Sequence, residues 1–459
     1  MFRARTDRTD PSGRSATGWD TRRQSCGCFP IATRGRSLVT ARSTVDAAHP
    51  TVGAANVTVV AARATVVLVA VATIAAAGCT DDPAVPPAAS EMVARYGLET
   101  MPPMVHPPDN PPNAHRIALG RLLFFDPVQS AHMDVACATC HLPRFAFTDG
   151  RNLPAGPSGI GLGPDRTLTD STMVEEGRNS PTVINVGFNR FFRQTTTDGF
   201  LFWDGRKRKL ENLVTLPQRE FSEMRASVYP VELALDSVIA RLRSLEEYEA
   251  AFGLAYPDRA ADVAAGRSAS AIDSATIAMS IAQFIRSLEG VNSPYDRFVR
   301  GEDGALTEQQ KRGLVLFHEK GRCVECHVGP MFSDFNFHVV GARQLGPGFQ
   351  ETPHEDLGRW NATRLDADRY RFRTPSLRNV AETAPYMHSG GYASLREAVE
   401  FFDRGGGDHP HVPTERLELR PLHLTPREID ALVAVLEALT DLPDVDAPDR
   451  VPSGLIPPR

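Results

Sequence analysis

The chain has 459 residues, of which 42% are hydrophobic and 23% are charged, so it can bury a sizeable core and is not disordered along its whole length. This length corresponds to about two or three domains at ~150 residues each. The net charge of −6 argues against a nucleic-acid-binding protein, because neutralising phosphates requires clustered Lys and Arg.

The first 79 residues have the composition of a targeting sequence rather than of a folded domain. Residues 1–57 hold nine Arg against four acidic residues and lack a sustained apolar period. They are interpreted as a disordered leader or as translated sequence upstream of the true start codon. Residues 58–79 contain an apolar run that is too short to span a membrane and is typical of a signal peptide.

This apolar run ends at Ala76–Cys79, which is similar to a bacterial lipobox, the motif in which the Cys is lipidated. We therefore predict a periplasmic protein that is tethered to the membrane through a lipid on Cys79. A plain secretory signal, cut near the same place, is the alternative. Residues 80–112 are rich in Pro and are expected to form a tether and an extended lead-in.

Helical patterns dominate the rest of the chain. Apolar residues recur with helical spacing in three segments, Val231–Phe252, Ala271–Leu288 and Ile429–Leu439. Two capping boxes, Thr307 with Gln310 and Thr425 with Glu428, mark helix starts. Because alternating strand patterns are scarce, the predicted fold class is mostly α, with long loops and few or no strands.

The seven cysteines indicate a cofactor. Cys26 and Cys28 lie in the leader, and Cys79 is the candidate lipid anchor. The other four form two C-x-x-C-H motifs, which consist of Cys137, Cys140 and His141, and of Cys323, Cys326 and His327. This is the attachment pattern of a c-type haem. The two thiols form thioethers with one haem, and the His that follows becomes a ligand of the iron.

A zinc knuckle, a redox dithiol and a disulfide are the alternatives for each motif. The two copies use every Cys after residue 79, and no second His follows either pair at zinc-finger spacing. Two covalent haems are therefore predicted. Each motif is expected to serve its own domain, with residues 113–298 and 299–443 as the two haem domains and 444–459 as a Pro-rich tail. Similar segments, Leu119–Phe125 and Arg312–His318, precede the two motifs.

Further blocks of sequence carry a family resemblance. They are Leu119–Asp126, Ala146–Gly150, Arg178–Thr182, Phe202–Arg206, Asn292–Arg297, Gly329–Pro330, Phe372–Asn379 and Ala384–His388, together with the two C-x-x-C-H motifs. In this order they resemble the bacterial di-haem cytochrome c peroxidases, which include the MauG-like enzymes. The resemblance runs from about Leu119 to Leu442. It implies two cytochrome-c-like haem domains.

The resemblance also implies a division of labour between the two haems. The first would react with hydrogen peroxide, and the second would receive electrons from a small cytochrome c or cupredoxin. Reduction of H₂O₂ to water takes two electrons, whereas such donors deliver one at a time, so two irons in one chain are functionally useful. The implied activity is a cytochrome c peroxidase.

Several residues acquire roles from the resemblance. Trp203 matches a Trp between the haems that passes electrons, Glu223 matches a distal-pocket carboxyl that moves protons, and Pro217 matches a wall of that pocket. Asn179, Thr383 and Pro385 match the oxygen ligands of a calcium ion between the domains. Without the resemblance, Trp203 would be interpreted as a core residue, Glu223 as a solvated surface group, and Asn179 and Thr383 as turn caps.

Three departures from the family pattern matter. A distal-pocket glutamine is replaced by Leu213, and no His occurs between His141 and His318 to close the first haem. The distal ligand of the second haem, Met or Tyr in relatives, falls on Phe402, which cannot bind iron. The sixth position there would hold water or hydroxide or stay empty; His409, His411 and Met387 are alternatives. A solvated loop is the preferred interpretation of His409 and His411.

Two more histidines, His318 and His338, are expected to pack or to contact haem propionates rather than to bind iron. Two alternative functions stay open beside the peroxidase. One is a MauG-like oxidase that modifies aromatic residues of a partner protein, which the missing His favours. The other is a non-enzymatic di-haem electron carrier, which would leave Glu223 without a purpose.

Overall fold

The computed structural model describes residues 87–189, 199–349, 352–353 and 355–459. Cys79–Arg459 forms one compact unit. The leader, the apolar run and the cysteines at 26, 28 and 79 lie outside the described residues, so the lipobox stays a prediction. Within the described ranges, no helix is long and apolar enough to cross a membrane.

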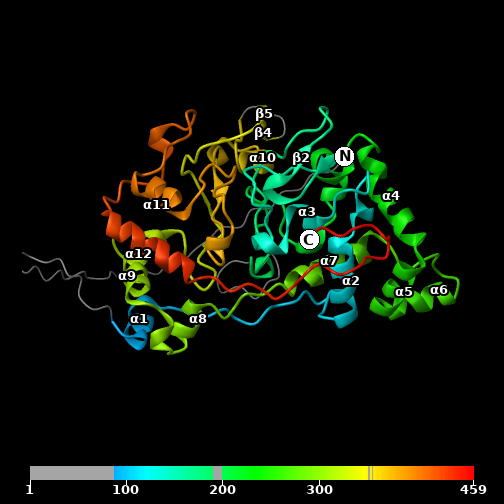
Figure 1. Cartoon of the computed structure of the whole chain (residues 1–459), viewed down its shortest axis with the longest axis horizontal. Helices are drawn as coiled ribbons and strands as arrows, with labels where there is room; N and C mark the ends of the chain where they lie inside the picture. The colour runs from blue at the N-terminus through cyan, green and yellow to red at the C-terminus, as the bar shows by residue number, and fades with distance from the viewer. Residues whose placement is uncertain (1–86, 190–198, 350–351, 354) are drawn as a thin grey trace, which may run out of the picture. The chain divides into compact units, whose positions relative to one another are not determined.

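The described part is mostly helical, as predicted (Figure 1). Its α-helices are α1 (Ala89–Tyr96), α2 (Ala114–Phe125), α3 (Cys137–Cys140), α4 (Val231–Arg243), α5 (Glu246–Ala255), α6 (Pro257–Ala264), α7 (Ser274–Arg286), α8 (Pro294–Val299), α9 (Glu308–His318), α10 (Trp360–Thr363), α11 (Leu395–Asp403) and α12 (Pro426–Glu437). Short 3₁₀ helices and one π-helical turn connect them.

Strands are few and short. Three antiparallel pairs of two-residue strands are present in the described ranges, β1 (Gly159–Ile160) with β2 (Thr167–Leu168), β3 (Phe337–His338) with β6 (Phe372–Arg373), and β4 (Gly348–Phe349) with β5 (Thr352–Pro353). In the β3–β6 pair, Phe337 lies opposite Arg373 and His338 lies opposite Phe372. Long loops therefore carry much of the chain between the helices.

Two apolar cores organise the helices. The first core forms where α2 packs on α7 and α5, and its largest buried side chains are Phe124, Phe125, Phe284, Tyr248 and Phe252. The second core forms where α12 packs on α9 and α11, and it includes Leu314, Phe317, Phe401, Leu432 and Val435. Complete burial of such a side chain stabilises a fold by roughly 1.5–3 kcal/mol each.

The two similar segments seen in the sequence occupy equivalent places in the two cores. Gly120 of α2 lies so close to α7 that a Cβ atom built on it would be 2.0 Å from the Ser280 carbonyl oxygen. Gly313 of α9 is related in the same way to α12, where a Cβ would be 1.9 Å from the Ala431 carbonyl oxygen. Each glycine thus lets a helix that leads to a C-x-x-C-H motif approach its partner helix closely.

Both predicted capping boxes are confirmed. Thr307 Oγ1 accepts from the Gln310 N–H at 3.2 Å, and Gln310 Oε1 accepts from the Thr307 N–H at 2.9 Å, at the start of α9. Thr425 and Glu428 form the same reciprocal pair at the start of α12. These bonds satisfy backbone donors that the first helical turn leaves without partners.

Two expectations about the helices need correction. The predicted helix 231–252 is two helices, α4 and α5, because Ser244 and Leu245 break it. The last turn of α4 carries Arg, and the first turn of α5 carries Glu, which suits the dipoles of two separate helices. Within the predicted tether, α1 is helical, and its Met92 is fully buried against the second core. The sequence pattern of α1 is weak because the helix has only eight residues and Pro-rich sequence flanks it.

Candidate active site

The first C-x-x-C-H motif begins on the single turn α3, and His141 ends that turn. The His141 N–H donates to the Cys137 carbonyl at 3.0 Å. Its side-chain Nδ1 lies 3.0 Å from the Phe147 carbonyl oxygen and 3.4 Å from Ser180 Oγ. Ser180 Oγ also donates to the Cys140 carbonyl at 2.7 Å. The orientation of the imidazole is thus fixed by groups on both sides.

The second motif repeats this arrangement on a 3₁₀ turn, Cys323–Glu325. The His327 N–H donates to the Cys323 carbonyl at 2.8 Å, and His327 Nδ1 lies 2.7 Å from the Phe332 carbonyl oxygen. A backbone carbonyl can only accept, so Nδ1 carries the proton in both histidines. The other ring nitrogen, Nε2, then has a lone pair free to bind a metal.

The side chains of both motifs fit covalent haem attachment. Burial lowers the pKa of His141 and of His327, which keeps each imidazole neutral and able to bind iron. Burial also raises the pKa of Cys137 and Cys323 to about 12. All four cysteines of the two motifs are free of disulfides. They are therefore available to form thioethers with two haems.

Glu223 lies on a π-helical turn, Phe221–Arg225, close to the first motif. Its carboxylate acts electrostatically on both Cys137 and Cys140. Burial and the negative charge of Glu176 raise the pKa of Glu223 to about 8. A solvated surface glutamate would keep its ordinary pKa, so this interpretation does not apply. Single π-helical turns are frequent at functional sites.

Glu176 is a second acidic group close to the first motif, and no motif or spacing in the sequence singles it out. Burial raises its pKa, which a hydrogen bond from Ser222 partly counteracts. The Glu176 Oε1 atom is buried and has no hydrogen-bond partner in the described part of the chain. Two carboxyl groups so close together disfavour double ionisation, so one proton is retained near the first motif.

Pro217 and Leu213, which the family resemblance assigns to the peroxide pocket, precede Glu223 closely in the chain. Pro217 starts a 3₁₀ turn, Pro217–Arg219, that packs on the π-helical turn. Leu213 is half-buried against the first core, as an apolar replacement for a glutamine would be. The buried Gln218 donates to Gln129 Oε1 at 3.1 Å, while its own Oε1 has no partner among the described residues.

Trp203 is hydrogen-bonded to two segments that are distant in the chain, one at Asn179 and one at Arg373. Its indole Nε1 donates to the Asn179 carbonyl at 3.0 Å. The residue after Asn179 is Ser180, whose hydroxyl donates to the Cys140 carbonyl of the first motif. Its own carbonyl accepts from the Arg373 N–H at 2.8 Å, on the side of the second motif. Trp203 is half-buried, and its backbone and ring are both fixed by these bonds.

A continuous series of bonded groups runs through Trp203. On one side, Asn179 is followed by Ser180, which contacts His141. On the other side, Arg373 is followed by Thr374, whose carbonyl accepts from Ser333 Oγ at 2.8 Å. Asp334, which follows Ser333 in the chain, donates its N–H to the Cys326 carbonyl at 2.8 Å. Only hydrogen bonds and short covalent stretches separate the two haem-attachment motifs along this route.

The residues expected to bind calcium lie on neighbouring loops. The Asn179 N–H donates to the His388 carbonyl at 2.8 Å, and its side-chain Nδ2 donates to the Arg151 carbonyl at 2.8 Å. The Thr383 hydroxyl donates to the Val380 carbonyl at 3.1 Å. No metal-binding group of three or more His, Cys, Asp or Glu occurs in the described part. The ligands expected from the family resemblance are the side-chain oxygen of Asn179 and the backbone oxygens of Thr383 and Pro385.

The residues considered as distal neighbours of the second haem differ in their burial. Phe402 and Met387 are half-buried against the second core, the core that Cys323 also contacts. His409 is 7% exposed, so its interpretation as a solvated loop residue is wrong; its Nε2 lies 3.3 Å from Gln344 Oε1. His411 has a side chain that is 63% exposed and is solvated as predicted.

A buried ion network beside Asn179 was also missed. Arg178 contacts both oxygens of Asp356, at 2.6 and 2.8 Å, and lies 2.7 Å from Asp204. All three side chains are buried. Arg178 and Asp204 lie in the blocks Arg178–Thr182 and Phe202–Arg206 that carry the resemblance, whereas Asp356 lies in none of the blocks. The network fixes the chain on both sides of Asn179 and Trp203.

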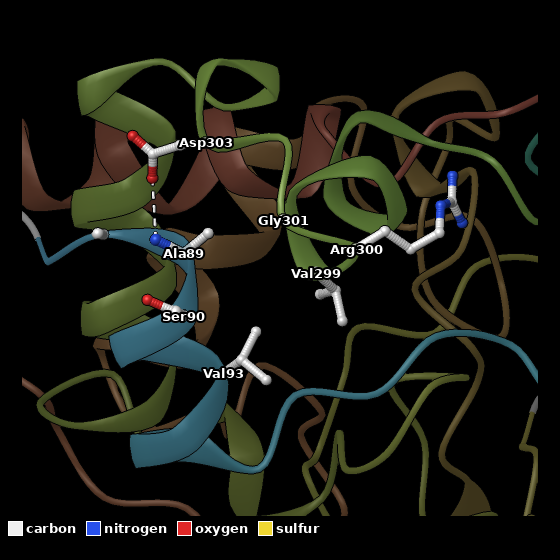
Figure 2. Close-up of a pocket in the computed structure, with 8 residues that line it drawn as sticks. Ala89, Ser90, Val93, Val299, Arg300, Gly301 and Asp303 are labelled. Carbon is white, nitrogen blue, oxygen red and sulfur yellow. Dashed lines mark hydrogen bonds between the residues drawn. The ribbon is translucent and has the colours of Figure 1, made fainter.

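A hollow of about 280 Å³ lies elsewhere, between α1 and the end of α8 (Figure 2). Val93 and Val299 line it, and the Ala89 N–H donates to Asp303 across its edge at 2.9 Å. None of its lining residues belongs to either C-x-x-C-H motif. It is therefore a separate feature from the candidate active site.

Comparison with known proteins agrees with the geometry. The sequence profile described as di-haem cytochrome c peroxidase matches residues 114–304. The cytochrome-c peroxidase IdrP2 of Denitromonas iodatirespirans is 33% identical over 353 residues, which cover 72% of this chain and 83% of the relative. The methylamine utilization protein MauG of Methylorubrum extorquens is 31% identical over 336 residues, which cover 73% and 80%.

A solved structure extends the similarity to the fold. The crystal structure of a MauG-like protein associated with microbial copper homeostasis matches with a TM-score of 0.60 and 28% sequence identity. The match covers 75% of this chain and 94% of that chain. The predicted mostly helical fold and the predicted resemblance are both confirmed by these similarities.

Proposed function

Because the chain belongs to the di-haem cytochrome c peroxidase family, we propose that it reduces hydrogen peroxide at a haem held by Cys137, Cys140 and His141. The observation that carries this proposal is the carboxyl of Glu223, which lies by the first motif with a raised pKa. The bound haem would supply the redox chemistry with peroxide.

Glu223 is proposed as the general acid–base group. With its raised pKa, the carboxyl is protonated at neutral pH and can donate a proton to the departing oxygen of peroxide. Glu176 beside it keeps that proton available by opposing ionisation of both groups. Pro217 and Leu213 would limit the access of water to this place.

Electrons are proposed to reach the first motif from the second through Trp203. The hydrogen bonds from Trp203 to Asn179 and from Arg373 to Trp203 support this route. A haem on Cys323, Cys326 and His327 would accept single electrons from a small cytochrome c or a cupredoxin. Calcium bound by Asn179, Thr383 and Pro385 would hold the loops beside Trp203 in place, which suits their oxygen donors.

A MauG-like oxidase is the second candidate function. It is favoured by the absence of any His between His141 and His318, which leaves the first haem without a competing ligand. In this case, the electrons that reduce the oxidised haems would be withdrawn from aromatic residues of a partner protein instead of being supplied by a cytochrome. Trp203 would then carry electrons in the same way.

Location in the periplasm is part of the proposal, because c-type haem attachment and the apolar run at residues 58–79 both suit an exported protein. A lipid on Cys79 would tether the protein to the membrane surface.

Steady-state turnover of H₂O₂ with reduced cytochrome c tests the proposed function. We expect peroxide-dependent oxidation of the cytochrome that requires both haems. Reaction of the protein with peroxide without oxidation of cytochrome c or cupredoxin would favour the MauG-like alternative. Absence of any reaction with peroxide would contradict both.

A further inference from the structure

His338 is held between two carboxylates. Its Nδ1 lies 2.6 Å from Glu418 Oε2, and its Nε2 lies 2.9 Å from Asp334 Oδ2. An ionised carboxylate only accepts hydrogen bonds, so each ring nitrogen must carry a proton to satisfy both contacts. The imidazole is therefore a cation, with both of its ring nitrogens in contact with carboxylates.

This cation belongs to the surroundings of the second motif. The Asp334 N–H donates to the Cys326 carbonyl at 2.8 Å, and the His338 side chain contacts that of Cys326. Asp334, Cys326 and Glu418 together raise the pKa of His338 to about 11, against the opposing effect of burial. A thioether on Cys326 carries no charge, so in the haem-bound protein the two carboxylates remain to hold the proton.

The cluster is also rigid. His338 ends β3, which pairs with β6. The Glu418 N–H donates to the Val339 carbonyl at 3.0 Å. Arg371 lies 2.8 Å from the other oxygen of Glu418 and donates to the Phe337 carbonyl at 2.6 Å. The charged groups that face His338 are thus Asp334 and Glu418, with Arg371 behind Glu418.

A positive charge near a haem opposes the ferric state and raises the reduction potential. The family resemblance assigns Phe402 to the position of the distal ligand, and a phenyl ring cannot help to set that potential by binding iron. We propose that His338 is a positioning residue whose fixed charge raises the reduction potential of the haem on His327, so that this haem can accept electrons from a donor protein. This inference rests on the proposed function of the second haem as electron acceptor.

Potentiometric titration of the holoprotein, followed by the absorption of each haem, tests the inference. In His338→Gln, we expect a lower midpoint potential for the second haem and an unchanged potential for the first. Glu418→Gln removes a negative charge beside the same group and is expected to shift the second potential upward. His338→Lys keeps a positive charge and is expected to restore part of the wild-type potential.

Opposite shifts in the two variants separate charge from structure, because mere disruption would not change sign. An unchanged second potential in His338→Gln, with both haems attached, would overturn the inference. If His338→Gln fails to fold, a downward or absent shift in Glu418→Gln would overturn it. Peroxide reactivity is measured separately on chemically reduced wild type, so failure of the proposed function is recognised independently.

Discussion

Glu223 and Glu176 form a pair of carboxyl groups that share a buried place near the first haem motif. Glu223→Gln keeps the shape of the side chain but removes its ability to exchange a proton. We expect the rate constant for reaction with H₂O₂ to fall by ~10²–10⁴-fold, the usual contribution of a general acid–base group. Stopped-flow absorbance of the haem bands measures it.

The matched control for this change is Glu232→Gln, which alters an exposed carboxyl in the first turn of α4. Both variants are expected to keep both haems, as shown by their haem absorption. Peroxide kinetics in Glu223→Gln equal to those of wild type would show that another group moves the proton.

Glu176 should act through the pKa of Glu223. Glu176→Gln removes the negative charge that opposes ionisation of Glu223, so the pKa of Glu223 is expected to fall. Because the protonated acid is the active form below that pKa, the alkaline limb of the pH–rate profile should move to lower pH. An alkaline limb at the wild-type position would mean that the two groups are not coupled.

The raised pKa of Glu223 also determines how the free energy of unfolding depends on pH. The pKa of Glu223 is raised from 4.5 to about 8, so the fold favours its protonated form. This contribution to the free energy of unfolding is fully present below pH 4.5 and is lost as the pH rises through 8.

At the residue scale, sequence patterns were informative where chemistry dictates spacing. The two C-x-x-C-H motifs are predictable because thioether attachment needs two thiols beside an iron ligand. Glu176, Ser180 and the Glu418 carboxylate beside His338 were not, because their partners come from distant parts of the chain. His409 was taken for a solvated residue because its neighbours Gly407 and Pro410 suggest a loop, whereas burial depends on the segments that cover it.

At the scale of elements, the two helix pairs α2–α7 and α9–α12 depend on close approach at Gly120 and Gly313. We expect Gly120→Ala and Gly313→Ala each to lower the free energy of unfolding by ~1–3 kcal/mol, because the new Cβ forces the paired helices apart. Chemical denaturation of the holoprotein, followed by circular dichroism, measures this.

Gly253→Ala in α5 is the control, since its Cβ would be 3.9 Å from Ala260 Cβ, an ordinary contact. There the better helix propensity of Ala should stabilise the protein by up to ~1 kcal/mol. Equal effects at all three positions would contradict the role assigned to close packing.

Helices with explicit caps were predicted well, and the break between α4 and α5 was not. Thr307 and Thr425 act within one helical turn, so their neighbours in sequence determine them. The break at Ser244 interrupts a nearly continuous apolar pattern, and tertiary packing decides it. The same holds for α1, whose Met92 becomes significant only against the second core.

At the scale of the whole molecule, two haems per chain are the basic requirement. We expect a pyridine haemochrome assay to give two c-type haems per chain, and acid acetone to extract neither of them, because all four thiols are free of disulfides and would form thioethers. Cys137→Ser with Cys140→Ser should remove one haem and abolish the reaction with peroxide. One haem in the wild-type protein would contradict this account.

The central claim is that the haem on His141 is open to peroxide, since no His between His141 and His318 is available to close it. Electron paramagnetic resonance of the as-isolated ferric protein tests this most directly. We predict a high-spin ferric signal that disappears on addition of H₂O₂ without prior reduction. Two wholly low-spin signals, with no reaction until one electron is added, would show that a distant ligand such as His132 closes the site and would contradict the claim.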